Sequence, residues 1–214
     1  MKEKQILFSA PMVRALQART KTQTRRAFND KAGWHFFDGQ GDMSLCPYGQ
    51  PGDLLWVKET FYAFGRWETR FNAEKARDEW HFVDMTLASG KAYSYAADGG
   101  QPLPMAGKRA GGVTPKWWKR PAIFMPRAAS RITLEITEVR VERLQDISAA
   151  DCISEGIGFE VRFSGHCLPD GSHFHTSDPR ISYWSLWDSI NGAGSVEANP
   201  WVWCVAFTRL EGQR

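Results

Sequence analysis

The sequence predicts an α+β fold, a small mixed β pseudo-barrel with short helices and long loop insertions. Two observations support this class. About five or six strands and three short helices follow one another without the regular strand–helix alternation of a parallel sheet. The 214 residues are 43% apolar and 24% charged, which is ordinary globular composition. The length suits one large domain or two small ones.

We expect residues 1–214 to form a single domain with three insertions, at about 28–45, 66–116 and 157–178. Residues 29–50 are rich in glycine and aspartate and read as a loop. Residues 66–98 mix charged and aromatic side chains with weak periodicity, and residues 99–116 contain five glycines and three prolines. Such segments favour loops over regular elements.

The first elements follow from local signals. Pro11 suits the first turn of a helix, and Val13 and Leu16 continue an apolar stripe to about residue 18. The polar segment 20–26 then predicts a turn into a strand. A glycine-rich turn at 49–53 leads into the apolar run 54–57, which is typical of a short buried strand.

The second half contains the clearest patterns. Ile132, Leu134 and Ile136 alternate with polar residues, and the apolar phase then slips by one residue, which predicts a β-bulge. Ser148 and Asp151 have the spacing of a capping box, so a helix should run to Glu155. Gly156 should end that helix.

Two more elements complete the chain. A helix should begin at 178–179, where aspartate precedes proline, and end at 191–192, where asparagine precedes glycine. Residues 201–207 are all apolar and predict either a central strand or an edge strand covered by other residues.

The net charge of +3 hides an uneven distribution. Residues 1–26 hold seven basic residues and one acidic residue, and residues 105–131 hold seven basic residues and no acidic one. These two segments carry +13 and the rest of the chain −10. If they meet in space they form a positive face that attracts phosphates; basic residues scattered over a solvated surface are the alternative.

Several classes of protein are excluded. No stretch approaches the roughly 18 apolar residues of a membrane span, and the N-terminus lacks a signal-peptide core. The four cysteines are far apart with no CxxC spacing, which favours free thiols in a reducing cytoplasm. We therefore expect a cytoplasmic protein with no membrane partner.

One segment of the sequence contains residue types that could bind a metal ion. His166, Cys167, His173 and His175 are four possible zinc ligands within ten residues. Adjacent histidine and cysteine chelate poorly, however, and the surrounding Pro, Gly and Ser residues read as a plain loop. We expect no metal and no cofactor.

The densest polar segment, residues 21–26, is the first candidate for catalysis. Lys21 beside Thr24 can act as a base and nucleophile pair if burial lowers the pKa of the lysine. The alternative is a basic strand end that contacts phosphate or water. Glu155, at the negative end of its helix dipole, breaks a local rule and is a second candidate. The alternative is a solvated glutamate for which the dipole penalty is small. Glu59 could point into a pocket or pair with a neighbouring cation.

Trp117 and Trp118 lie between basic residues, which is typical of base stacking combined with phosphate contact. A core pair is the alternative. The candidate nucleic-acid or substrate-binding residues are Arg25, Arg26, Glu59, Trp117, Trp118, Lys119, Arg120, Arg127 and Arg131.

These motifs together resemble a known family. The run from Ile6 to Met12, with Lys21-Thr22-Gln23-Thr24-Arg25-Arg26, resembles the opening of ASCH-domain proteins. Tyr48-Gly49 and Gly52-Asp53 before Leu55-Trp56-Val57-Lys58-Glu59-Thr60 are similar to the same group, as is the segment from Ser130 to Gly156. The ending, from Trp187 to Trp203, is similar to phage and prophage members. The resemblance leaves the three insertions unexplained.

The resemblance implies a PUA-like fold that binds RNA, single-stranded nucleic acid or a modified nucleoside in a cleft beside the first helix. Some small members of the family are amidohydrolases that deacetylate N4-acetylcytidine. Their lysine, threonine and glutamate fall on Lys21, Thr24 and Glu155. The chain departs from the pattern in being twice as long and in having Gln23 where an apolar residue is usual.

The resemblance suggests a mechanism. A neutral Lys21 takes a proton from Thr24, or from a water that Thr24 holds, and the nucleophile attacks the amide. Glu155 orients the lysine or protonates the leaving amine, and Arg25 or Arg26 stabilises the oxyanion or anchors a phosphate. The competing hypotheses are a non-catalytic nucleic-acid-binding module, a ribonuclease-like activity in the same basic cleft, and a phage structural or regulatory protein that keeps only the fold.

Overall fold

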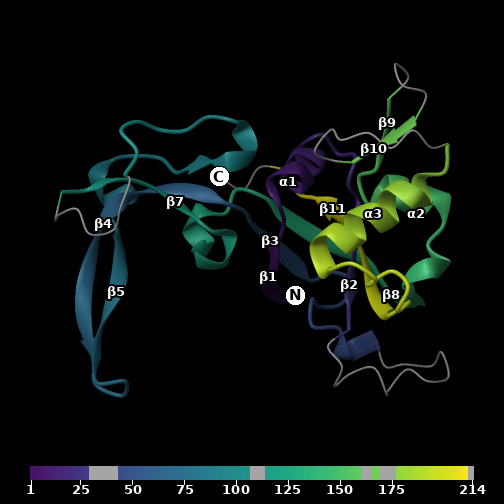
Figure 1. Cartoon of the computed structure of the whole chain (residues 1–214), viewed down its shortest axis with the longest axis horizontal. Helices are drawn as coiled ribbons and strands as arrows, with labels where there is room; N and C mark the ends of the chain where they lie inside the picture. The colour runs from purple at the N-terminus through teal and green to yellow at the C-terminus, as the bar shows by residue number, and fades with distance from the viewer. Residues whose placement is uncertain (29–42, 107–113, 161–164, 169–176, 212–214) are drawn as a thin grey trace. The chain divides into compact units, whose positions relative to one another are not determined.

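The computed structural model describes residues 1–28, 43–106, 114–160, 165–168 and 177–211 (Figure 1). These residues form an α+β fold rich in strands, with few and short helices, as the sequence predicts. The chain divides into two compact units. Unit 1 comprises Met1–Ile6, Pro11–Val57 and Arg131–Arg214, and unit 2 comprises Leu7–Ala10 and Lys58–Ser130.

One five-stranded sheet organises unit 1. Its strands, in spatial order, are β1 (Glu3–Leu7), β3 (Leu54–Lys58), β8 (Thr133–Arg143), β11 (Trp201–Arg209) and β2 (Gln23–Ala27). The helices are α1 (Ala10–Gln17), α2 (Ala149–Ser154) and α3 (Pro179–Asn191), with short 3-10 helices η2 (Met43–Leu45) and η7 (Leu144–Asp146). A small antiparallel pair, β9 (Gly158–Glu160) and β10 (Gly165–Cys167), stands beside the sheet.

The apolar run predicted near the C-terminus is a central strand. β11 lies between β8 and β2 and is antiparallel to both. Its register on β8 shifts between Ala206 and Phe207, which face Glu138 and Ile136, so Thr137 is the extra residue of a β-bulge. The bulge lies where the apolar phase slips in the sequence, and that prediction is confirmed.

Helices α2 and α3 pack on one face of this sheet. Their contact is an apolar cluster that includes Cys152 of α2, Tyr183 and Trp187 of α3, and Val202 and Cys204 of β11. Because β-strand side chains alternate, Val202 and Cys204 share a face of the sheet, and that face is the one the two helices cover. Figure 1 shows α3 lying across these strands.

The helix boundaries follow from their caps. Ser148 caps α2 by accepting a hydrogen bond from the Asp151 amide, and Asp178 caps α3 with Pro179 in the first turn. Gly156 has φ +99°, a left-handed value that ends α2 without a side-chain clash. The three helices predicted from the sequence are thus confirmed to within about one residue.

The sequence patterns missed strand β1, because its five residues alternate over too short a length to be distinguished from a loop. They also missed β9 and β10, which occupy part of the predicted insertion at 157–178. Most of the predicted insertion at 28–45 lies outside the described residues.

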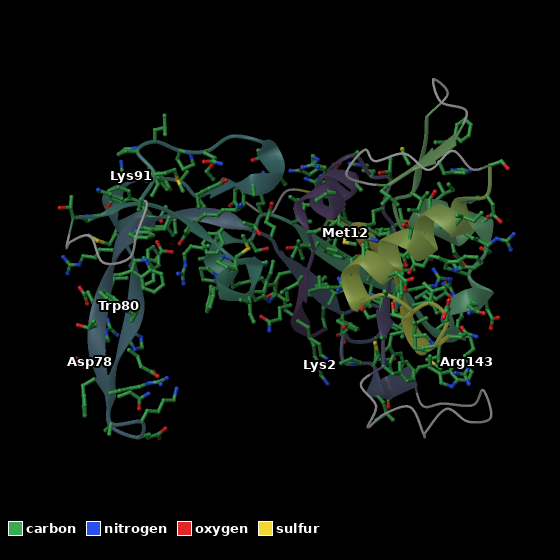
Figure 2. All side chains as sticks on the ribbon, viewed as in Figure 1. Lys2, Met12, Asp78, Trp80, Lys91 and Arg143 are labelled. Carbon is green, nitrogen blue, oxygen red and sulfur yellow. The ribbon has the colours of Figure 1, made fainter. Side chains whose placement is uncertain are left out.

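Unit 2 is built on the long strand β4 (Phe61–Asn72). It pairs with β5 (Arg77–Asp84), β6 (Ser94–Tyr95) and β7 (Lys116–Arg120), all antiparallel. The short 3-10 helices are η3 (Leu87–Ser89), η4 (Ala96–Asp98), η5 (Ala122–Phe124) and η6 (Arg127–Ala129). Phe61, Ala63, Met125 and Ala129 form its buried centre. Beyond Gly65, β4 and β5 continue as a two-stranded hairpin from which Asp78 and Trp80 project (Figure 2).

The strands of this unit correct the prediction of a loop insertion at 66–116. The weak periodicity of residues 66–98 arises because most of the β4–β5 hairpin is exposed on both faces, so neither face needs to be apolar. The compact unit is also wider than the predicted insertion, because Phe61 and Met125 on its two flanks supply its centre.

The predicted barrel is not closed among the residues that the structure describes. The five strands of unit 1 form an open sheet that begins at β1 and ends at β2. Within the described ranges, no helix is both long and apolar enough to cross a membrane.

The core of unit 1 generates a stability prediction. Leu134 of β8 is completely buried, whereas Leu45 of η2 is 49% exposed. Leu134→Ala should lower the free energy of unfolding by about 2–5 kcal/mol, because it removes buried apolar surface and leaves a cavity. Leu45→Ala should change it by less than about 0.5 kcal/mol. Urea unfolding of both variants measures the difference, and equal losses would contradict the placement of Leu134.

Candidate functional site

A buried lysine–glutamate pair forms the centre of the candidate site. The Nζ of Lys21 lies 2.8 Å from the Oε2 of Glu155 and 2.8 Å from its backbone oxygen. The two side chains are only 1% and 5% exposed. Lys21 and Glu155 are distant in sequence, and the structure brings these two predicted catalytic residues into direct contact.

Local geometry places both residues. Lys21 follows the end of α1 and precedes β2, and Glu155 is the C-cap of α2. The Thr22 amide donates to the Ser154 oxygen at 2.8 Å, which ties the two segments together. A Cβ on Gly156 would lie 3.5 Å from the Cβ of Lys21, which is an ordinary contact, so the φ of +99° and not crowding is what favours glycine here.

Burial dominates the protonation of Lys21. It lowers the pKa of the lysine below its ordinary value, and the attraction of Glu155 offsets only part of that effect. The nearby cations Arg26 and Arg25 lower the pKa of Lys21 further. A buried amine with a lowered pKa is suited to act as a proton acceptor.

Glu155 is held from a second side by Arg25. The Arg25 Nη1 lies 3.5 Å from the Glu155 Oε1, the carboxylate oxygen that Lys21 does not contact. The Arg25 side chain is completely buried. Its Nη2 binds the carboxylates of Glu142 at 2.7 Å and Asp151 at 3.0 Å. Arg25 therefore faces three carboxylates in the protein interior, which argues against the predicted role in anchoring a substrate phosphate.

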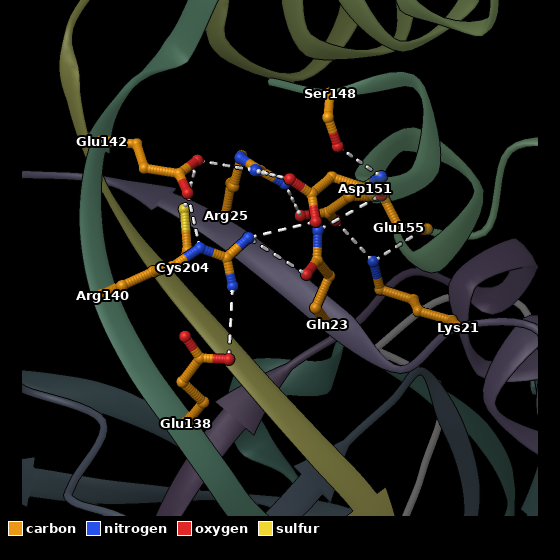
Figure 3. Close-up of polar contacts among 10 residues, drawn as sticks. All are labelled: Lys21, Gln23, Arg25, Glu138, Arg140, Glu142, Ser148, Asp151, Glu155 and Cys204. Atoms are coloured by element: carbon orange, nitrogen blue, oxygen red, sulfur yellow. Dashed lines mark hydrogen bonds and ion pairs between the residues drawn. The ribbon is translucent and has the colours of Figure 1, made fainter. Parts of the chain in front are cut away.

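Arg140 closes a ring of charges with the same two carboxylates (Figure 3). Its Nε lies 2.5 Å from the Glu142 Oε1, and its Nη2 lies 3.1 Å from the Asp151 Oδ1. Glu142 and Asp151 are thus each bridged by both arginines, one arginine on each oxygen. We call Arg25, Glu142, Arg140 and Asp151 the arginine–carboxylate ring.

The strand register explains this ring. Arg25 of β2 and Arg140 of β8 both face Cys204 of β11 in the ladder, so the three residues form one row across the sheet. Residues in one row project to the same face. That face is the one α2 covers, and α2 supplies Asp151. The Cys204 thiol donates to Glu142 at 3.4 Å within the same cluster.

A pocket opens beside the pair, along β2. The centre of a water-sized sphere can reach about 60 Å³ inside it, and the pocket opens to solvent. Thr24 and Glu155 line it together, with Arg26 from the same strand as Thr24. The remaining lining residues come from the helices and the strand end: Met12, Arg25, Ala27, Tyr183, Leu186, Trp187, Ile190 and Asn191.

Of the predicted catalytic residues, Glu155 and Thr24 line the pocket, and Lys21 contacts Glu155 without being among the lining residues. Thr24 is 3% exposed. Among the predicted binding residues of unit 1, Arg26 lines the pocket and Arg131 is half-buried outside it. These placements make the pocket the candidate active site.

The other predicted binding residues lie in unit 2. Glu59 is buried, with 1% of its surface exposed, and Arg127 is half-buried. The pair of tryptophans is half-buried, one on each face of β7: the Trp118 Nε1 donates to the Gly65 oxygen at 3.0 Å, and Trp117 packs edge-on against Phe64.

The basic residues of β7 differ in their surroundings. Lys116 and Lys119 are exposed. The Arg120 guanidinium instead lies 4.4 Å from the ring centre of Phe82 and 4.8 Å from those of Trp67 and Phe124. The two basic segments of the sequence thus fall mainly in different units, residues 1–26 in unit 1 and residues 105–130 in unit 2.

His166, the first of the four possible zinc ligands, has both ring nitrogens occupied. They lie 3.2 Å and 3.1 Å from the backbone oxygens of Gly158 and Ser177. His173 and His175 lie outside the described residues. In the part of the chain that the structure describes, no three His, Cys, Asp or Glu side chains are grouped as metal ligands.

The sequence patterns missed the residues that surround the pair. Charged side chains in a strand or a first helical turn usually lie on the surface, so nothing marked Arg140, Glu142 and Asp151 as part of a site. The spacing of Tyr183 and Trp187 predicted only that they pack on the core side of a helix. One signal was available: charged residues at 138, 140 and 142 alternate on one face of β8, which is unusual for a strand in the middle of a sheet.

No family model, curated protein or solved structure matches this chain.

The ring predicts how stability depends on pH. Burial would raise the pKa of Glu142, but hydrogen bonds from Arg140 and Arg25 outweigh burial and lower it. Burial would also raise the pKa of Asp151, but the charge and hydrogen bond of Arg25, with the contributions of Ser148 and Arg140, together lower it. Both groups therefore stabilise the fold above their unfolded pKa values of about 4. That stability is lost as the pH falls through their lower folded values.

We expect the free energy of unfolding to fall steeply below about pH 5 in the wild type and less steeply in Glu142→Gln. Glu138→Gln is the matched control, since Glu138 is 60% exposed and lies 3.8 Å from Arg140. Urea unfolding from pH 3 to pH 7 measures the slopes. Equal slopes in all three proteins would show that the ring does not stabilise the folded state.

Proposed function

We propose that unit 1 is an ASCH-like domain whose pocket binds an N4-acylated cytosine, as a nucleoside or in single-stranded nucleic acid, and hydrolyses the amide. The observation that carries the proposal is the buried Lys21–Glu155 contact of 2.8 Å beside a pocket that Thr24 also lines. A basic group of lowered pKa, a hydroxyl and a carboxylate are the groups that amide hydrolysis requires.

Glu155 positions the amine of Lys21. The backbone oxygen and the Oε2 of Glu155 each accept a hydrogen bond from the Lys21 Nζ at 2.8 Å. These two bonds fix the direction of the amine, so Glu155 orients the lysine for its role as a base. Arg25 holds the other carboxylate oxygen and prevents Glu155 from turning.

The reaction then proceeds in two steps. The Thr24 hydroxyl attacks the amide carbonyl carbon, and its proton passes to the lone pair of Lys21. The C–N bond breaks, the proton passes from Lys21 to the leaving N4 amine, and the acyl group remains as an ester on Thr24. A water, deprotonated by Lys21 in turn, attacks that ester and restores the hydroxyl. One water is consumed, and one carboxylic acid and one cytosine amine are released.

The remaining lining of the pocket suits a nucleoside. Tyr183 and Trp187, whose ring centres are 6.3 Å apart, present an aromatic wall from α3, with Leu186 and Ile190 beside them. Aromatic and apolar walls with few polar groups are typical of sites for small planar ligands. Arg26 is the basic lining residue that could contact a phosphate of the bound chain.

Purified protein incubated with N4-acetylcytidine should release cytidine, measured by chromatography. Thr24→Val and Glu155→Gln should each lower kcat/KM by about 10² or more, and Lys21→Met should do the same. Thr24→Ser, which keeps the hydroxyl, should retain measurable activity. Lys2→Ala, at an exposed lysine, is the control for a surface lysine.

Thermal unfolding of each variant separates loss of chemistry from loss of fold. No cytidine release by a folded wild type, or turnover unchanged in folded Lys21→Met, would overturn the proposed reaction.

A second candidate function is nucleic-acid binding by unit 2. Residues 58–130 hold twelve basic and seven acidic residues, a net charge of +5, while the rest of the chain carries −2. Lys116 and Lys119 are exposed on β7, on either side of the two tryptophans. A positive surface beside aromatic rings favours single-stranded nucleic acid.

This candidate predicts a salt dependence. The affinity for a single-stranded RNA oligonucleotide should fall linearly with salt on a double-logarithmic plot. Lys119→Ala should reduce the slope by about 0.7, the contribution of one phosphate contact to a single strand. Lys75→Ala is the control, because Lys75 pairs with Glu79 at 3.0 Å in the hairpin. Affinity that does not depend on salt would exclude a phosphate-binding surface.

A further inference from the structure

Strand β2 is an edge strand of the sheet in unit 1, and its hydrogen-bonding pattern fixes which backbone groups face outward. The Phe28 amide donates to the Trp201 oxygen at 3.1 Å, and the Phe207 amide donates to the Thr22 oxygen at 2.8 Å. Between these two bonds the register of β2 on β11 is continuous, from Ala27 opposite Val202 to Gln23 opposite Ala206.

In an antiparallel pair, hydrogen-bonded residues alternate with residues whose backbone groups turn away from the partner strand. Thr24 and Arg26 therefore direct their N–H and C=O groups toward β11. Gln23, Arg25 and Ala27 direct theirs to the open edge of the sheet. The order of the strands places no further strand beyond β2 among the described residues.

The backbone N–H and C=O groups of Arg25 and Ala27 that face the open edge lie beside the pocket, which both residues line. The pocket follows β2 from Thr24 to Ala27, and α3 forms its opposite wall. At Gln23 the edge is closed by α2, because the Gln23 Nε2 donates to the Asp151 backbone oxygen at 3.2 Å. The open edge is therefore two outward-facing residues long, and the Lys21–Glu155 pair lies at its closed end.

We propose that the backbone edge of β2 at Arg25 and Ala27 reads the hydrogen-bonding edge of the base, the N4 amine and N3 of a cytosine, while Tyr183 and Trp187 contact its ring. The inference rests on the proposed function of this pocket, and it assigns base recognition to main-chain groups. An amide N–H donates to N3, and a carbonyl oxygen accepts from the N4 amine.

The length of the open edge favours a base over a peptide. A peptide that adds a strand needs a run of alternating backbone groups, whereas a base edge needs one or two donor–acceptor pairs. Backbone groups in a pocket need a partner, and a planar ligand with its own donors and acceptors supplies one. The aromatic wall of α3 suits the face of the same ring.

The arginine–carboxylate ring makes this edge rigid. Arg25 presents its backbone to the pocket while its side chain is fixed by Glu142, Asp151 and Glu155. The same residue thus links base recognition to the position of the catalytic carboxylate. A fixed edge loses little conformational entropy on binding.

Amide hydrogen exchange with NMR detection tests the inference within one strand. In the free protein the Arg25 and Ala27 amides should exchange faster than the Thr24 and Arg26 amides. Cytidine at ten times its Kd should slow the exchange of at least one outward amide by about tenfold and leave Thr24 and Arg26 unchanged. N4,N4-dimethylcytidine, which lacks the N4 donor, should bind at least about tenfold more weakly than cytidine.

A pair of proline variants provides a second measurement. Ala27→Pro removes an outward N–H that β11 does not use, so the variant should fold and bind cytidine about tenfold more weakly. Arg26→Pro removes an N–H within the ladder and should lower the melting temperature strongly. The inference would be overturned if folded Ala27→Pro bound cytidine as tightly as the wild type and cytidine did not slow the exchange of the Arg25 amide.

Further outcomes separate this inference from the proposed reaction. Protection of the outward amides without turnover of N4-acetylcytidine would keep the recognition edge and reject the chemistry. Turnover without that protection would keep the chemistry and reject the edge. Protection by a Val–Thr alternating hexapeptide and not by cytidine would overturn the inference in favour of strand addition.

Discussion

The interaction on which unit 1 depends is the buried set of charges around Arg25. Arg25 and Arg140 share the carboxylates of Glu142 and Asp151, and Arg25 also reaches Glu155. Three elements, β2, β8 and α2, meet in these contacts. Removing one carboxylate from this cluster leaves the buried Arg25 less well compensated and so lowers the free energy of unfolding. The cluster therefore links α2 to the sheet.

The same charges organise the candidate site. Each oxygen of Glu155 has its own cation, Lys21 on Oε2 and Arg25 on Oε1. Burial is the largest effect on the pKa of Lys21 and lowers it, Glu155 raises it, and the charges of Arg26 and Arg25 lower it further. The candidate site thus places an amine of lowered pKa against a carboxylate that two cations hold.

Residues that are neighbours in the sequence have different roles in the structure of this chain. Lys21, Thr24 and Arg25 come from one short segment, yet they serve three purposes because β2 is an edge strand. The Arg25 side chain points beneath α2, Thr24 lines the pocket, and the backbone of Arg25 faces the open edge. Unit 2 is organised differently, with a small aromatic centre and a positive net charge.

The sequence by itself determined the elements whose signals are local: the caps at Ser148 and Asp178, the stop at Gly156, the bulge near Thr137 and the apolar strand β11. It also singled out Lys21, Thr24 and Glu155, through motif and resemblance. Only the tertiary structure decided that the predicted loops at 66–116 belong to a second unit, and that the side chain of Arg25 faces three carboxylates. Partners across a sheet and strand edges are long-range properties, because pairing joins residues that no local pattern connects.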